Sequence, residues 1–391
     1  MQSKAIAVII VLSAGSLAVV RALGTQRIPL IIIEKKENQN RCDLKTKYGK
    51  KIFVDNIIGQ NLINALTKLA LANNNQKMIL FPVMDALVSY LSQHRNELPS
   101  NVTLPFPSYN IIKLLMDKSL FKEFAEQHRF PIPKTLVVKN YEEVEKAIEC
   151  LQFPVILKTK VKVYIKGIAK AHILKNKNEL ISLYKKISPF CKTYILQEFI
   201  PGGDDQVYFC MQYISQEGKL LASFTGRKIR QWRPLCGGTA SCEPVYAPEL
   251  HELTYEIFKK ANFWGIGSIE YKKDPRDGKY YIIEPTVCRT DFQEEVAIAN
   301  GVNIPYIAYC DILGLPVKPV IKNGGNKAWM CVTADRLAAE YYIKRRKLTK
   351  AKWLWSLRKV RAFDLFDLRD LNPTICALKN KIKNRLRRLI D

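Results

Sequence analysis

The stretch from Gly265 to Arg289, GIGSIEYKKDPRDGKYYIIEPTVCR, constrains the fold more than any other segment of the chain. It predicts two β-strands, GSIEYKKD and GKYYIIEP, because each is rich in β-branched and aromatic residues. A turn around Pro275, Asp277 and Gly278 joins them, since Pro, Asp and Gly are typical turn residues. The segment is therefore expected to form a β-hairpin.

Each predicted strand carries one acidic side chain on an otherwise apolar or aromatic segment: Glu270 on the first and Glu284 on the second. Successive strand residues point to opposite faces, so acids on paired strands can project from one face. Two carboxylates on a partly buried face repel each other unless a cation lies between them. Mg2+ is usually held by one or two carboxylates and substrate phosphates. A nucleotide enzyme is the leading hypothesis, and a solvated hairpin is the alternative.

The first residues predict a β-α-β opening. AIAVIIVL is typical of a buried parallel strand, SAGS of a tight turn, LAVVRALG of a helix and IPLIIIE of a second strand. The alternative is a signal peptide, which is less favoured because Ser13, Gly15 and Ser16 interrupt the apolar run. Asp85 ends a later strand, KMILFPVMD. Such an acid lies either at the ligand-binding edge of an α/β sheet or at a helix cap.

The chain has 391 residues, which is enough for two or three domains. Its ten cysteines are dispersed without a C-x-x-C pair, and four histidines offer no zinc-ligand spacing. We expect unpaired cysteines and a reducing compartment, most simply the cytoplasm. The predicted elements indicate an N-terminal α/β part, a smaller second unit, a mostly antiparallel third unit and a basic C-terminal segment.

The formal charge of +26 favours anionic partners. Between Tyr341 and Asp391 there are sixteen Lys or Arg against four Asp. Nucleic acid is the less favoured partner because no known binding motif accompanies these cations. The last segment repeats Ile382, Leu386 and Leu389 at helical spacing. It can pack on the body, which is slightly favoured, or lie on an anionic membrane surface.

Three further features carry polar chemistry. Lys158 ends an apolar strand, FPVILK, and Lys118 lies early in a predicted helix. The segment ILQEFIPGGDDQVYF is a strand that breaks at Pro201 and then resumes. Each feature has an ordinary alternative, a solvated lysine or a plain turn.

In their order and spacing, DK (117–118), VILK (155–158), QEFIPGGDD (197–205) and the two strand acids resemble the ATP-grasp superfamily. Within it they resemble the carboxylate–amine ligases, including a branch similar to D-aspartate ligases and carbamoyl-phosphate-synthase-like proteins. The resemblance runs from about residue 5 to 315. It implies an α/β fold that is α+β in the catalytic half. The implied parts are a Rossmann-like pre-ATP-grasp domain at 1–115, a lid subdomain at 116–199, a catalytic subdomain at 200–318 and a basic extension at 319–391.

The resemblance also implies that ATP lies between two β-layers. Seven residues match the nucleotide-binding positions of the family: Lys118, Lys158 and Lys170 for the phosphates, Glu198, Phe199 and Ile200 for adenine, and Asp205 for the ribose hydroxyls.

The implied metal site holds two Mg2+ ions. Glu270 and Glu284 match the metal-binding acids, with Glu284 bridging the ions. Thr286 stands where many members carry Asn as a third ligand. A hydroxyl can coordinate Mg2+ directly or through water.

The implied reaction starts when a substrate carboxylate attacks the γ-phosphate of ATP, and an amine then captures the acyl phosphate. Positioning and charge neutralisation dominate such chemistry. Arg289, Arg227 and Arg230 are the candidates for this task, because forked guanidinium groups match carboxylate and phosphate oxygens. Arg227 and Arg230 lie on TGRKIRQWR, which leads to a small-residue loop, CGGTAS.

The expected function is therefore an ATP- and Mg2+-dependent ligase for small-molecule carboxylate and amine substrates. The basic balance favours an acidic amino acid or a cell-envelope precursor. Two alternatives stay open: an enzyme of the same fold that makes a carboxyl or carbamoyl phosphate, and a non-catalytic nucleotide- or polyanion-binding protein. Whether the chain forms a homo-oligomer does not follow from the sequence.

Overall fold

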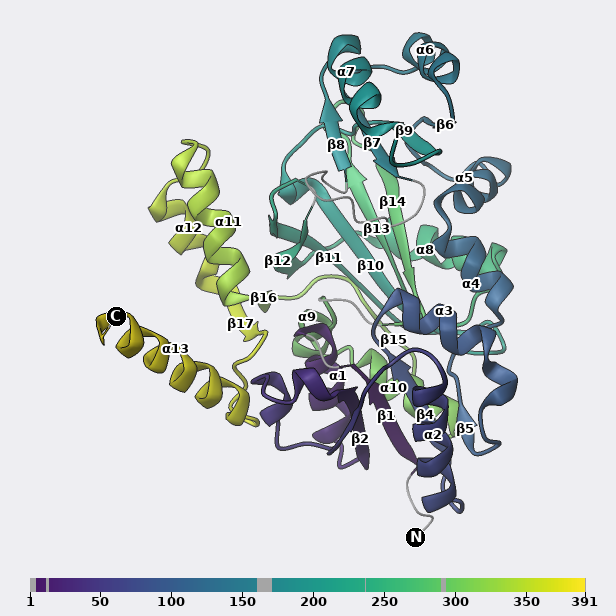
Figure 1. The fold of residues 1–391 in the computed structure, drawn as a ribbon, viewed down its shortest axis with the longest axis vertical. Helices are drawn as coiled ribbons and strands as arrows, with labels where there is room; N and C mark the ends of the chain where they lie inside the picture. The colour runs from purple at the N-terminus through teal and green to yellow at the C-terminus, as the bar shows by residue number, and fades with distance from the viewer. Residues whose placement is uncertain (1–4, 12–13, 160–170, 236, 290–292, 391) are drawn as a thin grey trace. The chain divides into compact units, whose positions relative to one another are not determined.

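The structure is a computed structural model that describes residues 5–11, 14–159, 171–235, 237–289 and 293–390 (Figure 1). It divides into two compact units. The larger comprises residues 1–112, 209–268 and 286–391, and the smaller comprises 113–208 and 269–285. Each unit has its own hydrophobic core. The mixed α/β fold class expected from the sequence is confirmed.

A five-stranded parallel sheet begins the larger unit, in the order β3-β2-β1-β4-β5. Every residue of β1 and β4 is buried, as expected for parallel strands covered on both faces by helices. The predicted β-α-β opening is present as β1, α1 and β2, but residues 14–16, which were expected to form a turn, belong to α1. The strands and helices of this part are β1 (Ile6–Ile10), α1 (Ala14–Gly24), β2 (Leu30–Lys35), β3 (Lys50–Val54), α2 (Gln60–Ala72), β4 (Met78–Pro82), α3 (Asp85–Gln93), β5 (Val102–Thr103) and α4 (Tyr109–Met116).

A second, eight-stranded sheet has the order β14-β13-β10-β11-β12-β16-β17, with β15 paired to β11. Along the chain, β13 and β14 carry residues of both units. The elements are β10 (Val207–Ile214), β11 (Leu220–Trp232), β12 (Gly238–Pro244), α8 (Pro248–Lys260), β13 (Gly265–Lys273), β14 (Tyr280–Val287), α9 (Glu294–Ala299), α10 (Ile304–Ile312), β15 (Val320–Lys322) and β16 (Ala328–Met330).

The expectation of a loop at CGGTAS is wrong from Gly238 onward. Residues Gly238–Pro244 form β12, which pairs antiparallel with β11 and with β16. The small side chains of this segment are buried, and α9 packs on the strand. Small residues are typical of loops, but they also allow a helix to approach a strand closely.

The smaller unit contains a four-stranded antiparallel sheet in the order β6-β9-β7-β8. Its core joins residues of this sheet to the apolar faces of α6 and α7. The elements are α5 (Lys118–Gln127), β6 (Thr135–Val138), α6 (Tyr141–Cys150), β7 (Val155–Thr159), β8 (Ala171–Leu174), α7 (Lys177–Ile187), β9 (Tyr194–Glu198) and the short helix η4 (Asp204–Gln206).

Helices α6 and α7 begin with the same hydrogen-bonded cap. The Asn140 side chain accepts a hydrogen bond from the Glu143 N–H at 2.9 Å, and the Glu143 carboxylate accepts one from the Lys139 N–H at 2.7 Å. Asn176 and Glu179 repeat this arrangement in α7. The reciprocal pair satisfies N–H groups that the first helical turn leaves unpaired, which defines where both helices start.

The C-terminal segment packs on the larger unit. Buried Arg21 donates to the Asp370 carboxylate at 3.2 Å and to the Leu365 carbonyl at 2.7 Å. Thr46 donates to the same carboxylate at 2.7 Å. A disulfide joins Cys42 to Cys376 across 334 residues. The elements of this segment are α11 (Val332–Lys344), α12 (Lys350–Ser356), β17 (Val360–Phe363) and α13 (Asn372–Ile390).

The expectation of unpaired cysteines is wrong for Cys42 and Cys376, because packing brings together two residues that sequence spacing does not relate. The other seven cysteines of the described residues are free thiols. Within the same residues, no helix is both long and apolar enough to cross a membrane.

Burial raises the pKa of the Glu295 carboxyl to about 8, with Arg21 opposing the shift. Between its usual value near 4.5 and 8, the folded chain holds a proton that the unfolded chain releases. The free energy of unfolding should therefore fall as pH rises through this window, by up to about 1.4 kcal/mol per pH unit. Glu295→Gln should flatten this slope in urea unfolding curves. Parallel pH dependences for both proteins would contradict the assignment.

Candidate active site

The acidic hairpin forms as the sequence predicts. In its turn, the Asp274 N–H donates to the Lys279 carbonyl and the Gly278 N–H donates to the Asp274 carbonyl, both at 2.8 Å. Gly278 has a φ of 71°, a value that glycine adopts without strain. The Arg276 side chain donates to the Asp274 carboxylate and holds its pKa below the usual value. The turn therefore fixes how β13 and β14 meet.

The two acids lie on neighbouring strands, Glu270 on β13 and Glu284 on β14. Both are half-buried, and Thr286 is 7% exposed. Thr286 follows Glu284 by two residues, so both side chains leave the same face of β14. Within the described residues no three acidic, His or Cys side chains form a metal-binding group. Two carboxylates and a hydroxyl suit Mg2+, which takes its remaining oxygens from phosphates and water.

Two consecutive side-chain hydrogen bonds hold Lys158 near the end of β7. Its ammonium donates to the Gln197 side-chain oxygen at 3.1 Å, and the Gln197 amide donates to the Thr135 hydroxyl at 2.8 Å. Antiparallel pairing of β7 with β9 and of β9 with β6 brings the three residues together. Lys158 is thus a half-buried cation on a rigid sheet, which suits a phosphate contact.

Lys118 is the first residue of α5. The side chain of Asp117 caps the helix by accepting from the Ser119 and Leu120 N–H groups at 2.8 and 3.1 Å. The cap explains the DK pair in structural terms, because it fixes where Lys118 leaves the backbone. Lys170 lies outside the described residues.

The predicted adenine segment follows β9. The Glu198 carboxylate accepts from the Gln152 N–H at 2.9 Å, and the Phe199 N–H donates to the Pro154 carbonyl at 3.0 Å. Ile200 is 5% exposed. These contacts fix the backbone of the segment, and because the Phe199 N–H is already used, adenine contacts would come from other atoms of it.

The predicted ribose acid, Asp205, is exposed in η4, whereas its neighbour Asp204 is buried. Gly202, just before this short helix, has a φ of 104°, where a side chain would be strained. The PGGDD segment therefore needs glycine at this bend, and it presents the Asp205 carboxylate to solvent.

Lys272 is a residue that the sequence reasoning missed. Its side chain is 5% exposed, and the ammonium lies 4.3 Å from the centre of the Phe199 ring. Lys272 follows Glu270 by two residues on β13, so both leave the same face. This two-residue spacing was the available signal. A buried lysine that contacts Phe199 of the predicted adenine segment, and shares a strand face with a predicted metal ligand, is a further candidate residue.

Arg289 pairs with Asp85: its Nε donates to the carboxylate at 2.5 Å. Asp85 is the first residue of α3, whose N-cap is Met84 and has no side-chain cap. Asp85 is therefore not the N-cap residue of α3, although it lies in the first turn of this helix, and its carboxylate pairs with Arg289. Cys288 has a φ of 63° and its N–H donates to the Ile266 carbonyl at 2.7 Å. This left-handed turn redirects the chain directly before Arg289.

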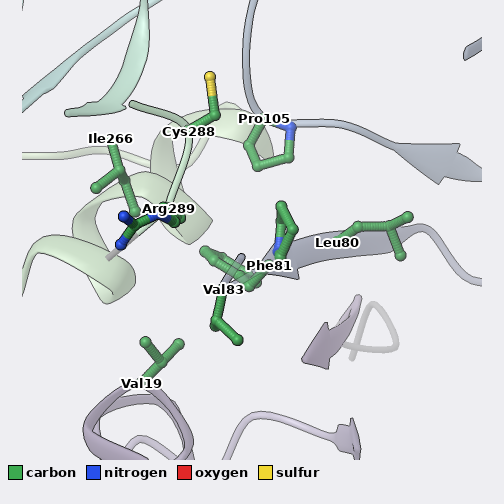
Figure 2. A pocket seen from close by; sticks show the side chains of 9 residues that line it. Val19, Leu80, Phe81, Val83, Pro105, Ile266, Cys288 and Arg289 are labelled. Carbon is green, nitrogen blue, oxygen red and sulfur yellow. The ribbon is translucent and has the colours of Figure 1, made fainter. Parts of the chain in front are cut away.

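A cavity of about 10 Å³ lies beside Arg289 (Figure 2). Arg289 and Cys288 reach it from the segment after β14, and Leu80, Phe81 and Val83 reach it from the end of β4. It has room for roughly one water molecule. The Arg289–Asp85 pair therefore lies at the carboxyl edge of the parallel sheet, where α/β folds bind ligands.

The other two arginines are held by acids of the larger unit. Arg227 lies directly opposite Glu243 in the β11–β12 register and donates to it at 2.8 and 3.0 Å. Arg230 is 5% exposed and donates to the buried Asp335 carboxylate at 2.7 Å. Trp353 donates to the other oxygen of Asp335 at 2.9 Å. Arg230 thus joins β11 to α11 and α12, while Arg227 is the more accessible.

The candidate residues divide between the two units. The described nucleotide-binding candidates and both acids belong to the smaller unit, whereas Thr286 and all three arginines belong to the larger. The smaller unit thus carries the acids suited to Mg2+ and the lysines suited to phosphates, and the larger carries Thr286 and the arginines, which suit carboxylate substrates.

Two curated proteins are similar in sequence. D-aspartate ligase of Enterococcus faecium is 26% identical over 278 residues, which is 66% of each chain. The N-terminal section of the carbamoyl phosphate synthase large chain of Aquifex aeolicus is 24% identical over 197 residues, 47% of this chain and 34% of that protein. The chain thus matches just under two thirds of the length of the first relative. No protein-family model matches it.

Solved structures share the fold. The biotin carboxylase domain of Hydrogenobacter thermophilus 2-oxoglutarate carboxylase, determined with MgADP and bicarbonate, has a TM-score of 0.64 at 18% identity, covering 82% of this chain and 73% of that one. N5-carboxyaminoimidazole synthetase of Staphylococcus aureus, complexed with ADP, has a TM-score of 0.61 at 15% identity, covering 82% and 80%.

Proposed function

We propose that this chain, a member of the ATP-grasp superfamily, is an ATP- and Mg2+-dependent ligase that joins a carboxylate to an amine. The carboxylate oxygen bonds to the γ-phosphorus, the bond to ADP breaks, and an acyl phosphate forms. The amine nitrogen then bonds to the acyl carbon, phosphate leaves and the nitrogen loses a proton. The product is an amide.

The protein's own groups position and neutralise charge in this scheme. Lys118 and Lys158 would contact phosphate oxygens, and Lys170 would join them from the lid. Glu270, Glu284 and Thr286 would hold two Mg2+ ions, which supply Lewis-acid stabilisation of the transferring phosphoryl group. Such positioning accounts for most of the catalysis of phosphoryl transfer.

The remaining nucleotide contacts follow the same logic. Glu198, Phe199 and Ile200 would border the adenine, with the Lys272 ammonium covering the Phe199 ring. Asp205, which is exposed, would accept hydrogen bonds from the ribose hydroxyl groups. Arg289 would bind the carboxylate substrate, and Arg227 would assist in neutralising its charge. Arg230 is the least suited of the three arginines to this role, because Asp335 already neutralises it.

The observation that supports this proposal most strongly is the pair of half-buried acids on neighbouring strands, in the same unit as Lys118 and Lys158. Two carboxylates are ligands that suit Mg2+. Two lysines in the same unit as the acids suit the phosphate oxygens of a nucleotide that would share the metal.

We further propose an acidic amino acid or a cell-envelope precursor as one substrate. The similarity to D-aspartate ligase supports an amino-diacid, and the charge of +26 supports anionic substrates in general. The expected location is the cytoplasm, where ATP is supplied. The Cys42–Cys376 disulfide does not favour this location, because a reducing compartment keeps thiols reduced.

The experiment measures ADP release with Mg2+ and ATP, pairing D- or L-aspartate with a panel of second substrates that carry a carboxylate or an amine. The ligase proposal expects release only when the carboxylate substrate and the amine substrate are both present. Release with the carboxylate alone, unchanged by any amine, would favour an enzyme that stops at a carboxyl or carbamoyl phosphate. Nucleotide binding without release across the panel would favour a non-catalytic protein.

Lys158→Ala should raise the KM for ATP and lower kcat, each by about tenfold, because a charge-assisted hydrogen bond contributes about 1.5–3 kcal/mol. Initial rates at varied ATP measure this. Lys146→Ala, on the exposed surface of α6 in the same unit, is the control and should match the wild type. An unchanged ATP dependence in Lys158→Ala would remove this lysine from the site.

A further inference from the structure

Within the residues that the structure describes, exposed large hydrophobic side chains are most frequent in the C-terminal part of the larger unit. Nine of the seventeen large hydrophobic side chains that are exposed in the described residues lie after residue 331. Four of them belong to one element, helix α13 and the residue before it (Figure 1). They are Leu371, Ile375, Leu378 and Ile382, between 41% and 59% exposed.

These four side chains form one stripe. At about 100° per residue, positions 371, 375, 378 and 382 fall within an arc of about 60° on a helix. We call this row the apolar stripe of α13. A stripe this narrow and regular is typical of a helix that binds an apolar surface along its length.

The helix is held by its opposite side. Cys376 forms a disulfide with Cys42, and the side-chain nitrogen of Asn380 lies 3.3 Å from the Cys42 sulfur. Pro373 is buried. On a helical projection these three residues lie between about 130° and 190° from the middle of the apolar stripe. The attachment therefore turns the stripe away from the residues that hold the helix.

Cations border the stripe on both sides. Lys379 and Lys383 lie along one edge, Lys381 and Arg385 lie along the other, and all four are exposed. The sequence of α13 contains no acidic residue. Apolar residues along the centre with lysines at both edges are the arrangement of helices that lie in the surface of a membrane, where the apolar side enters the acyl region and the cations meet anionic headgroups.

We propose that α13 binds the surface of an anionic lipid membrane through the apolar stripe and its bordering cations. A second copy of this chain fits less well, because it would bring two strongly basic helices together in a chain of net charge +26. Nucleic acid fits less well because phosphates would use the cations and leave the stripe in water. The expectation that this segment packs on the body holds only for its attached side.

The membrane contact does not depend on the ligase activity. It would hold the protein beside substrates that are made or used at the membrane, while Glu284 and Lys158 lie in the other unit. Binding and turnover can therefore be measured separately on the same protein.

The test is co-sedimentation of the full chain with phosphatidylcholine vesicles, with and without about one third phosphatidylglycerol. We expect binding to the anionic vesicles to be at least about tenfold tighter than to neutral ones and to weaken in high salt. The double variant Leu378→Glu/Ile382→Glu should lose at least about tenfold of that binding. Its ADP release and thermal unfolding should stay unchanged, because both side chains are exposed.

The matched control is Leu71→Glu/Tyr246→Glu, which adds the same two charges at exposed apolar positions of the same unit. It should bind as the wild type does. An equal loss in this control would mean that net charge alone drives binding, and would overturn the proposal. Equal binding to neutral and anionic vesicles, or none to either, would also overturn it.

Two other binding partners of the apolar stripe, nucleic acid and a second copy of this chain, would give different results. Tight binding to a single-stranded oligonucleotide without vesicle binding would assign the helix to nucleic acid. A dimer in light scattering that the stripe variant converts to a monomer, again without vesicle binding, would assign it to a second copy. Either result would contradict the membrane assignment.

Discussion

Glu284→Gln should reduce kcat by at least about a thousandfold while the protein stays folded. The substitution keeps the shape of the side chain and removes one negative charge from a residue that would hold Mg2+. A loss of about 4 kcal/mol of transition-state stabilisation corresponds to this factor. Initial-rate measurements at saturating ATP and substrates, across a range of Mg2+ concentrations, measure the effect.

The Mg2+ series separates a metal defect from a folding defect. In the variant, added Mg2+ should recover part of the rate, because the weakened site then fills further. Glu145→Gln, on the exposed surface of α6 in the same unit, makes the same chemical change and should match the wild type. Wild-type rates in Glu284→Gln, or a loss that Glu145→Gln shares, would remove Glu284 from the metal site.

Arg289→Lys should lower kcat by about 10²–10³-fold, although it keeps the positive charge. The guanidinium is the group that can donate to Asp85 and to a substrate oxygen at the same time, because its donors form a planar fork. A lysine ammonium can donate in good geometry to Asp85 or to the substrate oxygen, but not to both at the same time. The expected factor is that of removing one preorganised donor from a developing negative charge.

The control for Arg289→Lys is Arg336→Lys, on the exposed face of α11, which should leave the rate unchanged. Asp85→Asn should lower kcat less than Arg289→Lys does, because it weakens the hold on the guanidinium without removing it. If Asp85→Asn had the larger effect, the carboxylate of Asp85 and not Arg289 would contact the reacting groups.

The acidic hairpin was predictable because its signals are local. A turn of Pro, Asp and Gly between two aromatic and β-branched segments specifies a hairpin, and the structure contains β13 and β14 at those positions. The same holds for β1, α1 and β2. Each depends on residues within a few positions of one another.

The features that the sequence analysis missed depend on contacts between distant residues. Cys42 and Cys376 are separated by 334 positions, and Asp85 and Arg289 by 204. No spacing rule relates such pairs, because the fold alone determines their distance. The loop expected at CGGTAS was wrong for a related reason: small residues are common in loops, and the packing of α9 and α11 on β12 accounts for them in this strand.

The candidate site contains both kinds of residue: those that local sequence signals indicate and those that only the folded structure brings together. Glu270 and Glu284 were found from strand periodicity and charge, whereas Lys272, two residues after Glu270, was missed although the same periodicity puts it on the same face. Its burial and its contact with Phe199 became visible only in the structure. Likewise, the partners of Arg227 and Arg230 follow from strand register and from the packing of α11.

The central claim is that a substrate carboxylate attacks ATP and passes through an acyl phosphate. Its most direct test uses the substrate that supplies the carboxylate in the ADP-release assay, labelled with ¹⁸O in that carboxylate. Capture of the acyl phosphate by the amine leaves one carboxylate oxygen on the departing phosphate, so we expect one ¹⁸O atom in each phosphate released. Phosphate without the label, released together with amide product, would contradict it.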